Sequence, residues 1–119
     1  MSTETQSPTQ QAADVLDKAA DHLAAVGLHK GYLYDERQAK GSAMNRCRVC
    51  AVGAILTAAY GTPRYAVDDA DINVTDRAIF MLTEKVGEPI PSWNDHPDRT
   101  QDEVITALRD TANQMREAA

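Results

Sequence analysis

Residues 47–60 read CRVCAVGAILTAAY, and after Arg48 this segment contains almost no polar side chain. A helix that is apolar on every face is buried on every face. Its alanines and its glycine allow neighbouring backbones to approach closely. Gly61 ends the predicted helix, and Pro63 prevents it from resuming. We therefore expect residues 47–60 to form the central helix of a small bundle.

An amphipathic helix is predicted before this segment. It begins at the capping box Ser7–Gln10, with Pro8 at its first position. Apolar side chains then recur at helical spacing as far as Val26, with carboxylates and a lysine on the other faces. Gly27 is expected to end this helix in a left-handed conformation.

Two further helices are predicted in the second half of the chain. One starts near residue 73 or 75 and ends at Val86, and the other follows the capping box Thr100–Glu103. A chain of 119 residues has room for one core only. The predicted fold is therefore all-α, a single domain over residues 7–119 built as a bundle of about four helices.

The connectors between these helices are predicted to be irregular. Residues 28–45 form the longest connector, with a short extended segment at 31–34 where tyrosines alternate with small or apolar residues. Long connectors in compact domains are often functional. Pro89 and Pro91 predict an extended segment that leads into a turn-rich corner at residues 93–98.

The net charge of −6 narrows the range of partners. It disfavours nucleic acids, which need clustered cations, and it disfavours anionic membranes. One basic strip exists, but Asp35 and Glu36 lie in the same stretch, so it is interpreted as a solvated connector. Its basic residues are Arg37, Lys40, Arg46 and Arg48.

The polar leader, residues 1–6, is expected to be disordered and carries no secretion signal. The longest apolar stretch, residues 49–60, is too short to span a bilayer. A cytoplasmic protein with reduced thiols is the expectation that follows.

Cys47 and Cys50 form a Cys-x-x-Cys pair, a spacing that supports disulfide exchange at a helix N-terminus. A thioredoxin-like site also needs a strand before the pair, and here a charged loop precedes it. The pair is interpreted as two reduced, buried thiols, and thiol-redox chemistry is kept as an alternative.

Zinc is the second chemistry that the cysteines suggest. A structural zinc site takes four ligands, of which Cys47 and Cys50 would supply two. His29 and His96 are the candidates to complete the site, although they lack the paired spacing of a zinc finger. Solvated histidines are the favoured interpretation, so no cofactor is predicted and zinc is the alternative.

An acidic run, Asp69-Ala70-Asp71-Ile72-Asn73, has the alternation that opens a calcium-binding loop. Counted from its start, the sixth position is Val74 in place of glycine and the twelfth is Phe80 in place of glutamate. An ordinary solvated loop with a helix cap is expected.

The corner at Trp93, Asn94 and Asp95 is a candidate interaction site, since an exposed tryptophan commonly anchors a partner. The favoured interpretation is a tryptophan that closes one end of the alanine-rich core, with its two neighbours bonded to local backbone. Tyr32 and Tyr34 of the long connector are the other candidate contact residues.

The order and spacing of several short motifs resemble a family of small uncharacterised proteins from actinobacteria and their bacteriophages. The motifs are the C-x-x-G-A helix at residues 50–54, the W-N-D turn at 93–95 and the R-T-x-x-E-V segment at 99–104. The resemblance covers residues 12–115 and implies an intracellular protein of bacterial or phage origin. The family has no established activity to transfer.

The matched cysteine in this resemblance is Cys50, whereas Cys47 lies outside the pattern, which favours Cys50 as a small buried residue beside Gly53. No catalytic constellation is present in the sequence. We therefore expect a noncatalytic interaction or accessory module that binds another protein in the cytoplasm, that of the host if a phage encodes it. A homodimer is the alternative partner, because three amphipathic helices cover the apolar helix incompletely.

Overall fold

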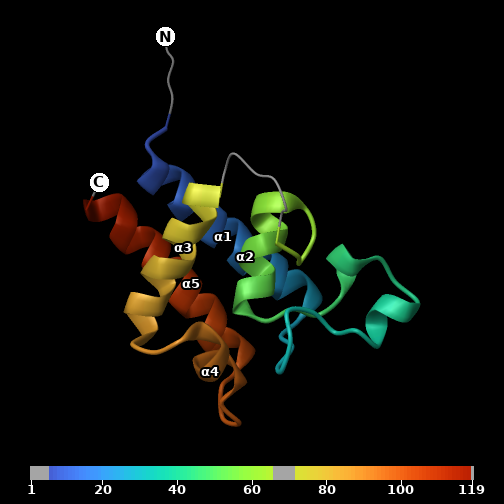
Figure 1. The fold of residues 1–119 in the computed structure, drawn as a ribbon. Coiled ribbons are helices and arrows are strands. Elements are labelled where there is room, and N and C mark those ends of the chain that lie inside the picture. Colours follow the sequence, from blue (N-terminus) through green and yellow to red (C-terminus); the bar gives the residue numbers. More distant parts are fainter. Residues whose placement is uncertain (1–5, 66–71, 119) are drawn as a thin grey trace.

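The computed structural model describes residues 6–65 and 72–118, and within these ranges the regular elements are all helices, beside two isolated β-bridges (Figure 1). The elements are α1 (Pro8–Val26), η1 (Gln38–Lys40), η2 (Met44–Arg46), α2 (Ala51–Tyr60), α3 (Ile72–Val86), α4 (Ile90–Asp95) and α5 (Gln101–Ala118). The predicted all-α bundle is confirmed. Among the described residues no helix is long and apolar enough to cross a membrane.

Two helices occupy the centre of the bundle. α1 packs against α2, α3 and α5, and α2 packs against α1, α3 and α4. Every residue of α2 from Ala51 to Leu56 is buried, as its uniformly apolar sequence predicts, whereas residues 57–60 are only half-buried, which corrects the expectation of burial along the whole helix. α1 and α5 both contribute alanines to the shared core, together with larger apolar side chains. The buried alanines on these two helices are Ala12, Ala13, Ala19, Ala20, Ala107 and Ala112.

The start of α2 differs from the prediction. The helix begins at Ala51, and Cys47 and Cys50 both have extended backbones, with ψ of 153° and 177°. The reason is long-range pairing: the backbone of Val49 forms isolated bridges with Leu28 and Tyr34, which hold residues 47–50 out of the helix. The extended segment predicted at 31–34 is reduced to the bridge at Tyr34.

The predicted helix caps are mostly confirmed. Ser7 and Gln10 form the reciprocal capping box of α1, and Thr100 and Glu103 form that of α5. Gly27 is a correction, because it has a φ of 99° but a ψ of 160°, which is not left-handed helical. The direction of the chain after Gly27 is set by the bridge between Leu28 and Val49 rather than by a left-handed turn at the end of α1.

The segment after α3 is also a correction. Residues 90–95, predicted as an extended piece and a turn, form the short helix α4. Pro91 lies in its first turn, where a missing N–H is tolerated and the fixed φ suits a helix. Residues 1–5 of the expected leader, and Asp69 and Asp71 of the acidic run, lie outside the described residues.

Candidate functional site

The site is built where the connector 28–35 crosses the beginning of α2. The segment 47–50 is hydrogen-bonded on both sides. On one side, His29 N donates to Val49 O (2.8 Å) and Val49 N donates to Gly27 O (3.0 Å). On the other side, Cys50 N donates to Leu33 O (3.2 Å) and the amide of residue 35 donates to the carbonyl of residue 48 (2.9 Å). The connector is therefore fixed on both sides of a buried valine.

Gly53 and Cys50 explain the C-x-x-G motif in physical terms. A Cβ at Gly53 would overlap the carbonyl oxygen of Leu33, so glycine alone lets the connector pass this close to the helix. Cys50 is the N-cap residue of α2, and its sulfur accepts a hydrogen bond from Gly53 N (3.3 Å). The motif thus joins a helix cap to a close crossing of two backbones.

Asn94 of α4 connects this crossing to the rest of the fold. Its side chain is completely buried. Its Oδ1 accepts from Ala51 N (2.9 Å), the first amide of α2, and its Nδ2 donates to His29 O (3.1 Å). We expected Asn94 to bond local backbone, and this is a correction, since both backbone partners lie far away in the sequence. The side-chain amide of Asn94 thus caps the N-terminus of α2 in addition to the cap formed by Cys50.

Four further hydrogen bonds hold the connector against α4, α5 and the residues between them. Asp95 Oδ1 accepts from Gly31 N (3.0 Å), and Gln101 Oε1 accepts from Leu28 N (3.0 Å). Lys30 Nζ donates to the carbonyls of residues 96 and 97, at 2.8 and 3.3 Å. Every residue from 28 to 31 therefore has a hydrogen bond to another part of the chain, when the amide and carbonyl of His29 are included.

Trp93 lies inside the fold, next to Asn94. Its side chain is buried in the core, and the guanidinium of Arg99 stacks on its ring, 4.2 Å from the centroid. Arg99 Nε also donates to Trp93 O (3.0 Å). The R-T-x-x-E-V motif thus begins with a residue that covers the tryptophan of the W-N-D motif.

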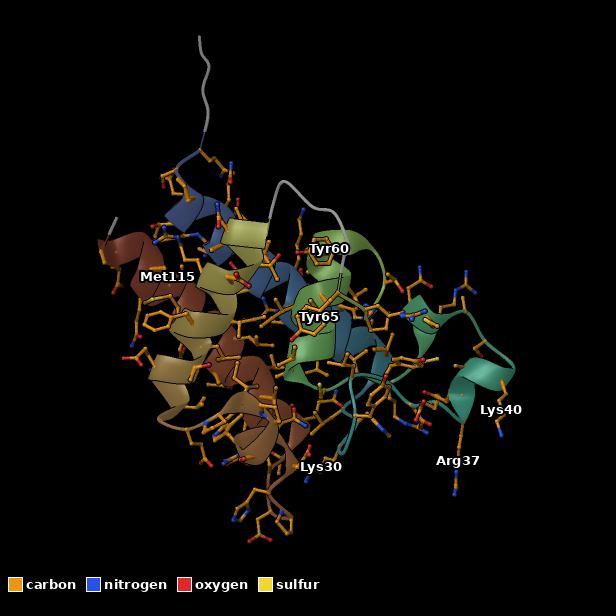
Figure 2. The ribbon with its side chains drawn as sticks, in the orientation of Figure 1. Lys30, Arg37, Lys40, Tyr60, Tyr65 and Met115 are labelled. Carbon is orange, nitrogen blue, oxygen red and sulfur yellow. The ribbon has the colours of Figure 1, made fainter. Side chains whose placement is uncertain are left out.

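A pocket of about 230 Å³ opens between the connector, α2 and α4. Its apolar and aromatic lining comes from Tyr32, Leu33, Val52, Tyr65 and Pro91, and Cys50 and Asp95 add a thiol and a carboxylate. Tyr32 is 48% exposed and Tyr65 is 61% exposed. Figure 2 shows Tyr65 over α2. We call this site the tyrosine pocket.

The predicted interaction residues divide between the pocket and its support. Tyr32 and Asp95 line the tyrosine pocket. Tyr34 packs its ring against that of Tyr32, with centroids 5.3 Å apart, and is half-buried. Trp93 and Asn94 do not line the tyrosine pocket and are buried, Trp93 to 8% exposure and Asn94 completely.

Both cysteines are free and buried. Burial raises the pKa of the Cys47 thiol, and it raises that of the Cys50 thiol, so neither favours the thiolate that disulfide exchange requires. Cys47 Sγ donates to Ala43 O (3.4 Å). The positions of these thiols suit packing and capping better than redox chemistry.

The four predicted zinc ligands are not arranged as a set. His29 lies 4.0 Å from Asp35, and His96 Nδ1 accepts from Asp98 N (3.2 Å). Cys47 and Cys50 have the partners described above. In the ranges 6–65 and 72–118, no three His, Cys, Asp or Glu side chains are placed to hold one metal ion. No observation therefore favours the zinc alternative.

Tyr65 and Val52 belong to the pocket but have no signal in the sequence. Tyr65 follows α2 in a polar connector, and burial raises the pKa of its hydroxyl. Val52 is one of many apolar residues in its helix. Gly53 was the available signal, because a glycine inside an apolar helix indicates a close backbone approach.

The chain belongs to a family of unknown function, DUF6197, whose model matches residues 7–114. The match includes the capping box of α1, the crossing at Gly53, the W-N-D helix and most of α5. No curated protein and no solved structure matches the chain. The function is therefore argued from the site itself.

Proposed function

We propose that this protein is a noncatalytic interaction module whose tyrosine pocket receives one apolar or aromatic side chain of a partner protein. The observation that carries the proposal is the pocket with two half-exposed tyrosines at its rim. Tyrosine is enriched at protein interfaces because it offers a large contact area with few rotatable bonds. The proposed setting is the cytoplasm of a bacterium, or of a phage-infected host cell.

The size of the pocket supports a side chain over a cofactor. Pockets for drug-sized ligands and cofactors occupy about 300–1,000 Å³. The tyrosine pocket, at about 230 Å³, is smaller than that range. Interface hot spots, by contrast, are single large side chains seated in small apolar pockets.

The hydrogen bonds behind the pocket support binding without rearrangement. Leu33, Gly31 and Asp95 are each fixed by a bond to another element before any partner arrives. A preorganised site loses less conformational entropy on association. More of the free energy gained from apolar contact with the pocket walls should therefore remain as binding affinity.

The polar groups of the pocket support binding over turnover. Cys50 is held as a neutral thiol, and its sulfur accepts the amide of Gly53. Asp95 Oδ1 already accepts hydrogen bonds from Gly31 N and Asn94 Nδ2. A nucleophile or general base needs a free, activated group, and these two are engaged in holding the fold.

Selection from a random peptide display library tests the proposal. The folded protein should enrich peptides with a shared apolar or aromatic residue. Tyr65→Ala should weaken their binding about tenfold or more, the usual effect of removing an aromatic contact at an interface hot spot. Tyr32→Ala should act in the same direction. Isothermal titration calorimetry measures both, after circular dichroism has shown that the variants fold.

Phe80→Ala is the matched control. Phe80 is 59% exposed, close to the value for Tyr65, but it lies on α3 and does not line the pocket. Peptide binding should be unchanged in this variant. Enriched peptides that bind Tyr65→Ala and Tyr32→Ala as well as the wild type, or a selection that enriches no peptide, would contradict the proposal.

A further inference from the structure

We propose that the partner segment that fills the tyrosine pocket is acidic, and that its carboxylates bind a basic protrusion beside the pocket. This inference rests on the proposed function and names the chemistry of the partner. The basic protrusion comprises residues 36–48, with η1 and η2, and carries Arg37, Lys40 and Arg46 on exposed positions.

The charge of the molecule is strongly uneven along the chain. Residues 30–48 contain five of the 12 Lys and Arg residues but only two of the 18 Asp and Glu residues. The whole chain nevertheless carries a net charge of −6. A positive segment is therefore attached to an otherwise negative protein, and such a distribution selects for a negatively charged partner surface.

One of the two acidic residues in this stretch, Asp35, is engaged in hydrogen bonds within it. Asp35 is 8% exposed. Its Oδ2 accepts from the Arg48 guanidinium (2.8 Å), and its Oδ1 accepts from Arg37 N (3.0 Å) and Gln38 N (3.4 Å). The Arg48 guanidinium holds the pKa of this carboxyl below its usual value. Asp35 thus compensates Arg48 and shapes the turn, whereas Arg37, Lys40 and Arg46 remain exposed to solvent.

The other three cations of the protrusion differ from Arg48 in having no acidic partner in the described ranges. Among the residues that the structure describes, no carboxylate forms an ion pair with Arg37, Lys40 or Arg46. Figure 2 shows the side chains of Arg37 and Lys40 pointing away from the helices. Glu36 is the exposed acid of the protrusion. Its single negative charge is therefore outnumbered by the three positive charges of Arg37, Lys40 and Arg46.

The basic protrusion has a defined shape. Ala39 N donates to Asp35 O (3.2 Å) and Gly41 N donates to Gln38 O (3.0 Å), which closes the turn at η1. Gln38 Oε1 accepts from Arg48 N (2.7 Å) and fastens this turn to the segment that enters α2. The cations are therefore presented from a folded turn, and binding does not first have to order a loose loop.

The protrusion and the tyrosine pocket are close enough for one short segment to reach both. Tyr32 lines the pocket, and Arg37 follows it by five residues. Their Cα atoms are at most about 18 Å apart, because a residue spans no more than about 3.6 Å. An extended strand rises about 3.3 Å per residue, so about six residues cover that distance.

An acidic protein segment fits this surface better than a nucleic acid. Nucleic-acid binding takes a broad basic face that neutralises many phosphates. Here the exposed cations are few, and the charge outside residues 30–48 is strongly negative. A polyphosphate backbone would be repelled by that remainder, whereas a short acidic segment would contact the protrusion alone.

The display selection described above provides the test. The enriched peptides should carry Asp or Glu near the shared apolar or aromatic residue. The double variant Arg37→Glu/Lys40→Glu should bind them about tenfold more weakly than the wild type, because two attractions become repulsions. The loss should shrink at high salt, since the contacts are exposed.

The matched control is Arg77→Glu/Lys85→Glu on α3. Both residues are exposed, and this double variant changes the net charge by the same amount. Peptide binding should stay within about twofold of the wild type. An equal loss in the control would show that net charge alone is responsible, and it would overturn the inference.

Two results separate this inference from the proposed function. Peptides without acidic residues, whose binding is lost in Tyr65→Ala but kept in Arg37→Glu/Lys40→Glu, would overturn the inference and leave the function standing. Peptides that are insensitive to both variants would overturn both.

Separate measurements would identify other kinds of partner that bind the basic protrusion. Light scattering that shows a low-salt dimer abolished by Arg37→Glu/Lys40→Glu would assign the protrusion to a second copy of the chain. Tighter binding of a single-stranded oligonucleotide than of the acidic peptides would assign it to nucleic acid. Either result would overturn the acidic protein partner.

Discussion

The α1–α5 side of the molecule and the connector side around Gly53 are stabilised by different interactions. α1 and α5 pack through apolar side chains of the core, several of them alanines, and arginines of α5 form exposed ion pairs with carboxylates of α1. On the connector side, residues 27–35 and 47–51 are joined by backbone hydrogen bonds and by a buried amide. Exposed ion pairs contribute little each, whereas a buried polar group that loses its partner is costly. The connector side should therefore be the more sensitive to single substitutions.

Asn94→Ala should have the largest effect. It leaves the buried amide of Ala51 and the carbonyl of His29 without their partner, at a cost of about 3 kcal/mol in the free energy of unfolding. Urea unfolding followed by circular dichroism measures this. Asn113→Ala, at an exposed position of α5, is the control and should change the stability by less than about 0.5 kcal/mol. Similar values for the two variants would remove the distinction between the two sides.

Gly53→Ala should come second, with a loss of about 2 kcal/mol from overpacking. Alanine is favoured over glycine inside a helix by about 1 kcal/mol, so the expected sign opposes helix propensity. The reason is the carbonyl of Leu33, which occupies the space of the new methyl group. Gly41→Ala is the control, because a Cβ there meets no atom within 4 Å. A Gly53→Ala variant as stable as the wild type would mean that the connector moves freely over α2.

Removing the ion pairs on the other side should cost less. Arg109→Gln/Arg116→Gln breaks the pairs with Asp14, Asp17 and Asp21, and we expect a loss of about 1 kcal/mol at low salt. High salt should remove most of the difference between variant and wild type. A loss as large as that of Asn94→Ala, or one independent of salt, would show that these pairs hold the bundle together.

The smallest effect concerns pH. Burial lowers the pKa of His22 on α1, and its Nε2 is buried with no hydrogen-bond partner among the described residues. The folded chain then binds fewer protons at this imidazole than the unfolded chain, so stability should fall as the pH drops below about 6.5. His22→Gln should flatten this part of the stability profile. Identical profiles for His22→Gln and the wild type would exclude His22 as the cause.

The sequence predicts the periodic side of the molecule well and the connector side poorly. The starts of α1 and α5 can be predicted from Ser7, Thr100 and Glu103, because a helix cap is a local interaction between residues three apart in the sequence. The start of α2 at Ala51 depends on Asn94, 43 residues away, and on Leu33. Such pairings are set by tertiary packing and leave no local pattern, so residues 47–50 look helical in the sequence and are extended in the structure.

The candidate site shows the same division. Tyr32 and Asp95 could be named in advance because aromatic and acidic residues stand out in a connector, and both line the tyrosine pocket. Tyr65 could not, because nothing in its own neighbourhood indicates that α2 ends beside the connector 31–33. The Cys-x-x-Cys spacing suggests chemistry, but both cysteines are buried. Cys50 caps α2, and Cys47 occupies a core position.

The burial of Trp93 beneath Arg99 has a practical consequence. It is the single tryptophan of the sequence, so the fluorescence of the protein on excitation near the red edge of the absorption band comes from one place in α4. Pro91 and Asp95 of the same short helix line the tyrosine pocket. The natural chain thus carries its own optical reporter, in which emission wavelength and quenching follow the docking of α4 without any attached dye.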